Sequence, residues 1–177
     1  MTTNDDREYP GIVVSSGRVL PAWIDVNDHM NVAYYVLAFD QAVDALWQRF
    51  GITAESIAAT GWSTFAVECH VTYQAELDLD DEYVVTSVIL AYDAKRIHQL
   101  QRMFRRRDGA LAATCEWMNL HVDLGVRKVS PWPDDVLAKI AAQANGQGEV
   151  GLPPEAGRRM LVREPLYTCN PDYPRPD

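Results

Sequence analysis

The spacing of the hydrophobic residues changes near residue 51 and divides the sequence into a helical part and a strand-forming part. In the helical part, apolar residues recur at intervals of three and four, which is the spacing of one buried helix face. They are Val32, Val36, Phe39, Val43, Leu46 and Phe50. Tyr35, Ala42 and Trp47 widen this face, so the predicted helix needs apolar cover on most of its sides. Gly51 supplies a stop signal after it.

After the helix the apolar residues alternate with polar ones or form continuous β-branched runs, and both patterns predict strands. The four segments are 65–73, 83–92, 96–107 and 110–122. The pair Asp108-Gly109 between the last two predicts a two-residue hairpin turn, because both residues tolerate a positive φ. The last three strands, joined by tight connections, predict an antiparallel meander, and the first is expected to be half-buried.

The two ends of the chain carry weaker signals. Residues 1–16 predict a loose arm in which 12–14 can form an edge strand, and residues 18–23 predict a short strand. Residues 133–142 predict a short helix with acidic side chains in its first turn. Because 6 of the 10 prolines lie in residues 146–177, this segment is predicted to be an irregular arm that wraps a neighbour or stays loose.

The order of these elements predicts an α+β fold with one domain, residues 1–145, and a proline-rich C-terminal extension, residues 146–177. A single antiparallel sheet that curls around the long helix would supply the apolar cover that the helix needs. Such a sheet keeps open edge strands. Edge-to-edge pairing of two protomers into one longer sheet would close one edge of each.

Composition narrows the classes of partner. The 177 residues carry a formal net charge of -9, which argues against a nucleic-acid or anionic-membrane binder, because both need clustered Lys and Arg. The longest apolar run, 32–39, is far short of the roughly 20 residues that span a bilayer. The polar, acidic start is unlike a secretory signal, so we expect a cytoplasmic protein. The widely spaced Cys69, Cys115 and Cys169 favour neither a disulfide framework nor a thiolate metal site.

The densest polar cluster stands directly before the predicted helix, in residues 25–31. A helix start presents free backbone N–H groups and a partial positive charge, and both suit a developing oxyanion. A carboxylate held beside it, such as Asp25, can attack an acyl carbon or activate a water. The simpler alternative is that Asn31 or Asp28 only caps the helix.

Two rival chemistries fit the sequence less well. Asp25, Asp28 and His29 could share a metal ion, but the other histidines are scattered along the strands, and we expect no metal. Ser63 lies in the segment GWSTF, which lacks the closing glycine of a nucleophile elbow and therefore argues against a serine hydrolase.

Residues 23–35, WIDVNDHMNVAYY, resemble the signature of hotdog-fold acyl-CoA thioesterases, the 4-hydroxybenzoyl-CoA thioesterase-like superfamily. The resemblance covers about residues 14–142 and includes FAVECHVTY at 65–73. Residues 88–98 and 108–123 are similar to one branch, the betainyl-CoA thioesterases that accompany or are fused to carnitine dehydrogenase. The resemblance implies a hotdog fold and hydrolysis of a short acyl-CoA, with coenzyme A entering only as part of the substrate and no separate cofactor.

The resemblance also implies roles for residues at the helix entrance. Asp25 matches the catalytic aspartate, either as nucleophile on the thioester carbonyl or as base for a water. The backbone N–H of Val32 would polarise that carbonyl, while His29 and Asn31 match residues that shape the entrance. Asp28 stands where the family usually has glycine, so the local backbone geometry stays open.

Three further residues are candidates for contact with the acyl group. Glu68 is a candidate second acid or substrate contact, and the simpler alternative is a surface carboxylate on an alternating strand. A trimethylammonium group is held by cation–π contacts and a carboxylate, and Tyr34, Trp62 and Glu68 are the candidates for such a cage. The alternative for the two aromatic residues is a place in the core.

A basic cluster precedes the predicted hairpin turn and is a candidate site for the phosphates of coenzyme A, because guanidinium groups match phosphate oxygens. Its members are Arg102, Arg105, Arg106 and Arg107. Lys95 and Arg96 open the same strand and could contribute. The simpler alternative is an exposed hairpin end that is kept soluble by its charges.

Together these features predict an acyl-CoA thioesterase that works as a homodimer or homotetramer, with active sites at the protomer interface and no nucleic-acid or membrane partner. One alternative is a non-catalytic module that binds acyl-CoA. Asp25 favours the enzyme, because a pure binder needs no carboxylate beside the thioester. A second alternative is a thioesterase that acts on aryl or fatty acyl-CoA.

Overall fold

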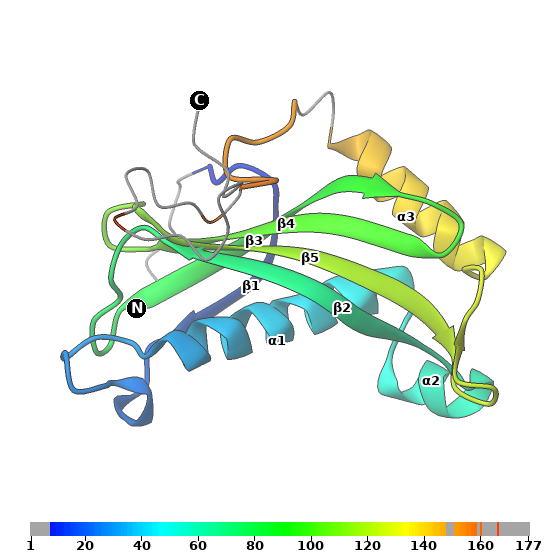
Figure 1. Cartoon of the computed structure of the whole chain (residues 1–177), viewed down its shortest axis with the longest axis horizontal. Helices are drawn as coiled ribbons and strands as arrows, with labels where there is room; N and C mark the ends of the chain where they lie inside the picture. The colour runs from blue at the N-terminus through cyan, green and yellow to red at the C-terminus, as the bar shows by residue number, and fades with distance from the viewer. Residues whose placement is uncertain (1–7, 148–150, 159, 161–165, 167–177) are drawn as a thin grey trace.

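A long helix, α1 (Val32–Phe50), lies along one face of a curled antiparallel sheet (Figure 1). The computed structural model describes residues 8–147, 151–158, 160 and 166. The strands are β1 (Ile12–Arg18), β2 (Trp62–Tyr73), β3 (Glu82–Tyr92), β4 (Arg96–Arg105), β5 (Leu111–Asp123) and the short β6 (Lys128–Val129). The order across the sheet is β1-β3-β4-β5-β2, with β6 beside β5. The predicted α+β hotdog fold is confirmed.

Helix α1 has the bounds that its apolar period predicts, and both ends have a local cause. At its start the Oδ1 of Asn31 accepts a hydrogen bond from the N–H of Ala33 at 3.0 Å. At its end Gly51 takes a left-handed conformation with φ 85°, which glycine adopts without steric cost. The sequence therefore specifies this helix by its caps as well as by its buried face.

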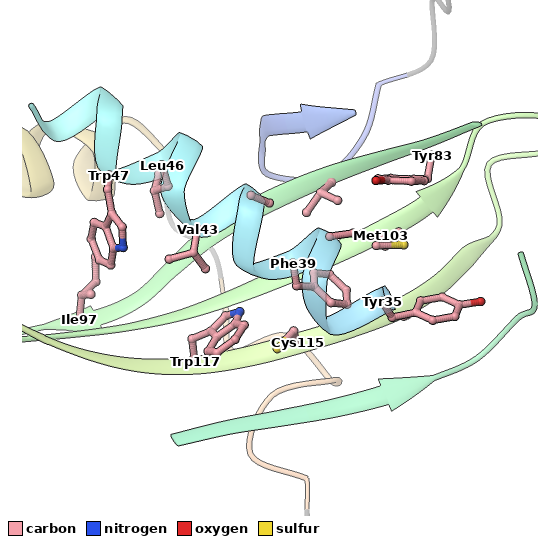
Figure 2. Close-up of a cluster of buried hydrophobic side chains, with 14 of the residues drawn as sticks. Tyr35, Phe39, Val43, Leu46, Trp47, Tyr83, Ile97, Met103, Cys115 and Trp117 are labelled. Atoms are coloured by element: carbon pink, nitrogen blue, oxygen red, sulfur yellow. The ribbon is translucent and has the colours of Figure 1, made fainter. Parts of the chain in front are cut away.

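The core lies between α1 and the concave face of the sheet (Figure 2). Phe39 and Leu46 of α1 are fully buried, and Met103 of β4 and Cys115 of β5 lie beside Phe39 on the sheet side. Burial of each large apolar side chain contributes about 1.5–3 kcal/mol to stability. Trp117 of β5 also faces the helix, so the residues of β5 at odd-numbered positions define the helix-facing side of the sheet.

Two further helices lie near the C-terminal end of α1. Helix α2 (Ala54–Thr60) begins at a capping box formed by Thr53 and Ser56. Helix α3 (Asp134–Gly146) contacts both α1 and β3 and extends the helix predicted over 133–142. Within the described residues, no helix combines the length and the apolar character that a bilayer crossing requires.

Two sequence predictions near the strands are wrong. The edge strand runs from Ile12 to Arg18, and the segment after it, Pro21–Trp23, is a 3-10 turn rather than the predicted strand over 18–23, since Pro21 sits at its start. The β4–β5 connection is five residues long instead of two. Its Asp108 carboxylate accepts hydrogen bonds from Arg105 and from the N–H of Ala110, which holds the wider loop.

Strand β2 is far more exposed than the predicted half-buried strand. A β-bulge lies between Ala66 and Glu68, so Val67 has no partner on β5. The bulge moves the residues beyond it by one position, and the sides of the sheet exchange: Phe65 points away from α1, whereas Tyr73 points toward it. The alternation in the sequence therefore does not mark one buried face.

The edges of the sheet are treated unequally. On β1, the carbonyl of Val13 accepts a hydrogen bond from Arg49 at 2.9 Å. Beyond the end of β1, the side-chain amide of Gln147 bonds both the N–H and the carbonyl of Ile89 on β3, at 2.8 and 3.2 Å. β2 pairs with β5 on its inner side. Within the part of the chain that the structure describes, the backbone groups on its outer side have no neighbouring strand, so β2 is the long open edge of the sheet.

The described part of the C-terminal extension packs against its own sheet, on the face opposite α1 (Figure 1). Glu155 bonds Arg102 at 2.9 Å, and the N–H of Gly157 bonds Glu116 at 2.8 Å. Residues 151–158 contain no helix or strand, as predicted, and they contact the sheet of their own chain. The prediction for residues 161–165 and 167–177, Cys169 included, lies outside the described residues.

Candidate active site

The polar cluster before α1 forms a small hairpin. The N–H of Asp25 bonds the carbonyl of His29 at 2.9 Å, and the N–H of Asn31 bonds the carbonyl of Trp23 at 2.8 Å. The turn between the two strands of this hairpin requires a left-handed residue, and Asp28 supplies it with φ 64°. A left-handed position suits the glycine that the hotdog thioesterases usually have here. In this chain Asp28 adopts the same conformation.

The hairpin is anchored to the segment between β2 and β3. The N–H of Met30 bonds the carbonyl of Leu77 at 2.8 Å, and the hydroxyl of the buried Tyr35 accepts a hydrogen bond from the N–H of Leu77 at 3.0 Å. His29 contacts the carboxylate of Glu76 at 3.0 Å. Burial raises the pKa of Tyr35, so this hydroxyl stays neutral and holds the loop at ordinary pH.

The carboxylate of Asp25 is partly buried and oriented by its own loop. Its Oδ1 accepts a hydrogen bond from the N–H of Asn27 at 2.8 Å. Among the described residues, Oδ2 has no hydrogen-bond partner. One oxygen therefore fixes the side chain, and the other is available to a ligand at the entrance of α1.

The first turn of α1 leaves one N–H group without a partner. Asn31 engages the N–H of Ala33 through its side chain and that of Tyr34 through its carbonyl, at 3.0 Å each. Within the described part of the chain, the N–H of Val32 donates to no acceptor, and the Val32 side chain is exposed. This end of the helix carries partial positive charge, so Val32 offers a donor to a negatively charged oxygen.

Aromatic rings flank the entrance. Trp23 and Tyr34 stack with their centroids 5.4 Å apart and an interplanar angle of 13°. On the sheet side, Tyr73 of β2 meets Tyr35 edge to face at 5.4 Å. Neither Trp23 nor Tyr73 was among the site residues predicted from the sequence. The place of Trp23 in the motif and that of Tyr73 at the end of β2 were the available signals.

Trp62 lies at the other end of α1. It lines a pocket of about 130 Å³ with Gly51, Ile52 and His121, beside the C-terminal end of the helix. A helix of 19 residues is about 28 Å long, so Tyr34 and Trp62 of one chain do not meet. The predicted cage is therefore not assembled within a single protomer.

Glu68 is also separated from Asp25. It pairs with Met118 on the side of the sheet that faces away from α1 and lines a cavity of about 490 Å³ between the sheet and the C-terminal segment. The Nε2 of His98 and the Oε1 of Glu116 lie within hydrogen-bond distance, at 2.6 Å, in the same cavity. Within one chain, the structure does not place Glu68 at the helix entrance.

The arginines of the basic cluster form ion pairs with carboxylates of the same chain. Arg102 is buried and pairs with the partly buried Glu155, and Arg105 makes a two-pronged contact with Asp108. Arg106 faces Glu82 at 4.0 Å, and Arg107 pairs with Asp78 and Asp81. Within one chain these arginines point to different carboxylates and are not gathered around one point, so their predicted contact with the phosphates of coenzyme A stays a prediction.

No group of three His, Cys, Asp or Glu side chains arranged as metal ligands occurs in residues 8–147, 151–158, 160 and 166. Of the predicted site, the structure brings together Asp25, His29, Asn31, Val32 and Tyr34 at the start of α1. It leaves Trp62, Glu68 and the arginines elsewhere.

One helix along a curled antiparallel sheet, with an acidic hairpin at the helix start, defines a hotdog-fold protein. Comparison with family models matches residues 19–140 to the thioesterase-like superfamily. The chain belongs to this superfamily and is a thioester hydrolase.

Two curated relatives and one solved structure resemble the chain. A betainyl-CoA thioesterase of Pseudomonas aeruginosa is 34% identical over 140 residues, which are 79% of this chain and 88% of the relative. An L-carnitine dehydrogenase/betainyl-CoA thioesterase of Rhizobium meliloti is 35% identical over 143 residues, 81% of this chain but 29% of that longer protein. A Staphylococcus aureus protein solved in complex with CoA has 26% identity and a TM-score of 0.81, covering 89% of this chain and 99% of that one.

Proposed function

We propose that the chain hydrolyses a short acyl-CoA thioester, with betainyl-CoA as the leading substrate, and that Asp25 is the acidic group that acts on it. The observation that carries the proposal is the oriented Asp25 carboxylate in a hairpin that leads into the free N–H of Val32. The names of the relatives from P. aeruginosa and R. meliloti support the substrate.

The start of α1 would stabilise the charge that develops in the reaction. When an oxygen nucleophile attacks the thioester carbon, the carbonyl oxygen becomes an oxyanion. The N–H of Val32 donates to this oxygen, and the helix dipole adds to the effect. A donor of this kind contributes about 10²–10³-fold to the rate of acyl transfer.

Two routes are open to Asp25, and both give the free acid and coenzyme A. As a general base, its Oδ2 takes a proton from a water whose oxygen attacks the carbonyl, and the proton passes to the departing thiolate as the C–S bond breaks. As a nucleophile, Oδ2 forms an anhydride with the acyl group and expels the thiolate, and water then hydrolyses the anhydride. The Asn27 N–H on Oδ1 orients the carboxylate for either route.

The aromatic rings at the entrance of α1 support the proposal that the acyl group of the substrate is cationic. A trimethylammonium group binds to aromatic faces with about 0.5–2 kcal/mol. Trp23 and Tyr34 present such rings beside the hairpin, and the carboxylate of Glu76 lies at its side. The net charge of -9 adds a favourable field for a cation.

The proposed enzyme is a homodimer built on the open β2 edge. A long, exposed edge strand invites pairing with another strand. The exposed apolar residues on β2 are Trp62 (43%), Phe65 (38%), Val67 (56%) and Tyr73 (48%). Pairing with a second copy continues the sheet and covers part of the exposed surface of these side chains.

Substitution of Asp25 tests the proposed chemistry. Asp25→Asn keeps the size of the side chain and the acceptor for the Asn27 N–H, but it removes the base and the nucleophile. We expect thioester hydrolysis to fall by about 100-fold or more, while coenzyme A binding persists. Asp28→Asn is the matched control: it removes one charge from the same loop and tolerates the same φ.

Release of free thiol and calorimetric binding of coenzyme A measure the two properties separately. Unchanged hydrolysis in Asp25→Asn would contradict the role of Asp25. Binding without hydrolysis in the wild-type protein would favour the alternative of a non-catalytic acyl-CoA-binding module.

A further inference from the structure

We infer that Glu76 is a specificity-determining residue, which selects a cationic acyl group by placing a carboxylate beside the thioester on which Asp25 acts. His29 holds this carboxylate, and the substrate class that it selects is a thioester with a quaternary ammonium group close to the carbonyl. The inference rests on the proposed function, because it concerns the substrate of the same site. It gives Glu76 the role for which the sequence suggested Glu68.

Asp25 and His29 lie opposite each other in the hairpin before α1. Ile24 and Met30 form an antiparallel bridge, so the next pair toward the turn is Asp25 with His29. The N–H of Asp25 bonds the carbonyl of His29 at 2.9 Å, in agreement with this pairing. Residues directly opposite across two strands point to the same side, with Cβ atoms about 4.5–5.5 Å apart. Because the buried Met30 marks the core side, the side chains of Asp25 and His29 point away from the core.

His29 brings the carboxylate of Glu76 to the same side of the hairpin as Asp25. The Nε2 of His29 lies 3.0 Å from the Oε2 of Glu76. Among the described residues, the Glu76 side chain has no second partner, so its Oε1 is available to a ligand. The side chain of Glu76 is 67% exposed, and a ligand at the entrance of α1 can therefore reach it.

The backbone at Glu76 is fixed although the side chain is exposed. The carbonyl of Glu76 accepts a hydrogen bond from Arg105 at 2.7 Å. The next residue, Leu77, is fully buried, and its N–H and carbonyl bond Tyr35 and Met30. A side chain on an anchored backbone has less conformational freedom to lose when it binds a ligand. Glu76 is therefore preorganised for a contact with the substrate.

The carboxylate of Glu76 also lies near the start of α1. Burial is the main cause of the raised pKa of Tyr35, and the negative charge of Glu76 adds to it. Tyr35 belongs to the first turn of α1, which begins at Val32. Glu76 thus lies close to the helix end at which the N–H of Val32 is proposed to bind the thioester carbonyl.

The neighbouring carboxylates are less suited to bind a cation. Asp78 and Asp81 both pair with Arg107, whose positive charge is permanent. Glu68 lies on the side of the sheet that faces away from α1. Glu76 faces a histidine instead of an arginine or a lysine, so no permanent positive charge is paired with it.

The place of the cation in a betainyl group fits this arrangement. Its quaternary nitrogen is separated from the thioester carbonyl by a single methylene group, so it must lie next to the residues that flank Asp25. A carboxylate and aromatic faces together bind such a group, and the stacked rings of Trp23 and Tyr34 lie at the same entrance. Between unit charges about 5 Å apart in a partly exposed site, the attraction amounts to about tenfold in affinity.

Two esters that differ only in charge test the inference. In tert-butylacetyl-CoA a quaternary carbon replaces the quaternary nitrogen of betainyl-CoA, so the shape is kept and the charge is removed. Glu76→Gln keeps an acceptor for His29 and removes the negative charge. We expect this variant to lower kcat/KM for betainyl-CoA by about tenfold, mainly through KM, and to leave the value for the neutral ester within about twofold of wild type.

Asp80→Asn is the matched control. Asp80 lies in the same segment between β2 and β3, is exposed, and has a φ of 65°, which asparagine tolerates. This variant removes the same charge and should change kcat/KM for either ester by no more than about twofold. If it lowers the value for betainyl-CoA as much as Glu76→Gln does, the overall field of the protein selects the cation and the inference fails. An equal loss for both esters in Glu76→Gln would show that Glu76 only positions the hairpin, and it would also overturn the inference.

Ionic strength gives a second measurement that a merely structural role of Glu76 would not change. Mobile ions screen the attraction between a carboxylate and a cation in a partly exposed site. Raising the salt concentration from about 0.05 M to about 0.5 M should therefore lower the ratio of kcat/KM for betainyl-CoA to that for tert-butylacetyl-CoA. The ratio should depend less on salt in Glu76→Gln, and an equal dependence in the two proteins would contradict the inference.

Binding to a variant that does not hydrolyse the esters separates this inference from the proposed activity. Calorimetry on Asp25→Asn, with and without Glu76→Gln, gives the Kd of both esters. We expect Glu76→Gln to raise the Kd of betainyl-CoA by about tenfold and to leave that of tert-butylacetyl-CoA unchanged. If this holds while the wild type hydrolyses neither ester, the proposed activity fails and the role of Glu76 stands. If the wild type hydrolyses betainyl-CoA and the Kd does not change, the role of Glu76 fails alone.

Discussion

Asp28 occupies a backbone conformation that non-glycine residues adopt at a cost. Its φ of 64° is required by the turn that returns the chain from Asp25 to His29. Aspartate tolerates this region better than most residues because its short polar side chain can bond locally. The geometry of the site therefore depends on a residue that need not touch the substrate.

Substitutions at position 28 should separate backbone geometry from charge. Asp28→Gly should leave the free energy of unfolding within about 0.5 kcal/mol of wild type, because glycine populates this conformation freely. Asp28→Ala should lose about 1–2 kcal/mol. Urea unfolding monitored by tryptophan fluorescence measures both, and equal stability of the two variants would contradict the assigned strain.

The lowered pKa of Asp108 predicts that the free energy of unfolding depends on pH. The side-chain hydrogen bonds from Arg105 hold its pKa at about 2, below its ordinary value of 3.8. A carboxylate with a lowered pKa in the folded state stabilises the protein above its unfolded pKa, and this contribution is lost as the pH falls toward 2.

The comparison of wild type with Asp108→Asn isolates this contribution. The difference in free energy of unfolding should be constant above about pH 5 and should shrink between about pH 4 and pH 2. Chemical unfolding at pH 6 and pH 2.5 tests it. A difference that grows on acidification would show that the ion pair does not stabilise the fold.

At the scale of elements, the C-terminal segment is held to the sheet by a nearly buried ion pair. Burial opposes ionisation of Glu155, but the hydrogen bond and charge of Arg102 outweigh it and lower the pKa of Glu155. Removal of one partner of such a pair strongly lowers the free energy of unfolding, since the remaining charge is left without a partner.

Removal of one partner should therefore cost more than removal of both. Glu155→Ala should destabilise the protein by about 1–3 kcal/mol, because the charge of the buried Arg102 is left without its partner. The double variant Arg102→Met with Glu155→Ala should recover part of the loss. If the double variant is as unstable as the sum of the single ones, the pair does not act as a unit.

The elements also show which parts of the structure a sequence can predict. Helix α1 follows from its apolar period, from Asn31 and from Gly51, and each of these signals is local. The bulge at Val67 is not marked, because one extra residue in an alternating strand leaves no compositional trace. The exposed β2 and the reversed faces therefore appear only in the structure.

The residues of the candidate site also fall into those that the sequence can predict and those that it cannot. Residues 25–34 were predictable as a group because they are contiguous and lead into a helix. The ion pairs of the arginines could not be predicted from the sequence, since they depend on Glu155 and on carboxylates of residues 78–82 that the fold places beside them. The separation of Tyr34 from Trp62 follows from the direction of β2 relative to α1, which composition and spacing leave open.

At the scale of the whole molecule, one chain supplies an incomplete enclosure for a substrate. The Asp25 carboxylate, the Val32 N–H and the Trp23–Tyr34 pair are assembled at one end of α1. Beside them the sheet ends at the open edge of β2. A second copy closes this edge, so the proposed dimer and the proposed activity depend on one surface.

Release of free thiol from a panel of acyl-CoA esters tests the central claim most directly. Betainyl-CoA would be compared with acetyl-, benzoyl- and long-chain acyl-CoA at equal concentrations, with Asp25→Asn measured beside the wild type. We expect the highest kcat/KM for betainyl-CoA and loss of hydrolysis in the variant. A preference for the aryl or long-chain esters would contradict the proposed cationic substrate, and hydrolysis of no ester would contradict the proposed activity.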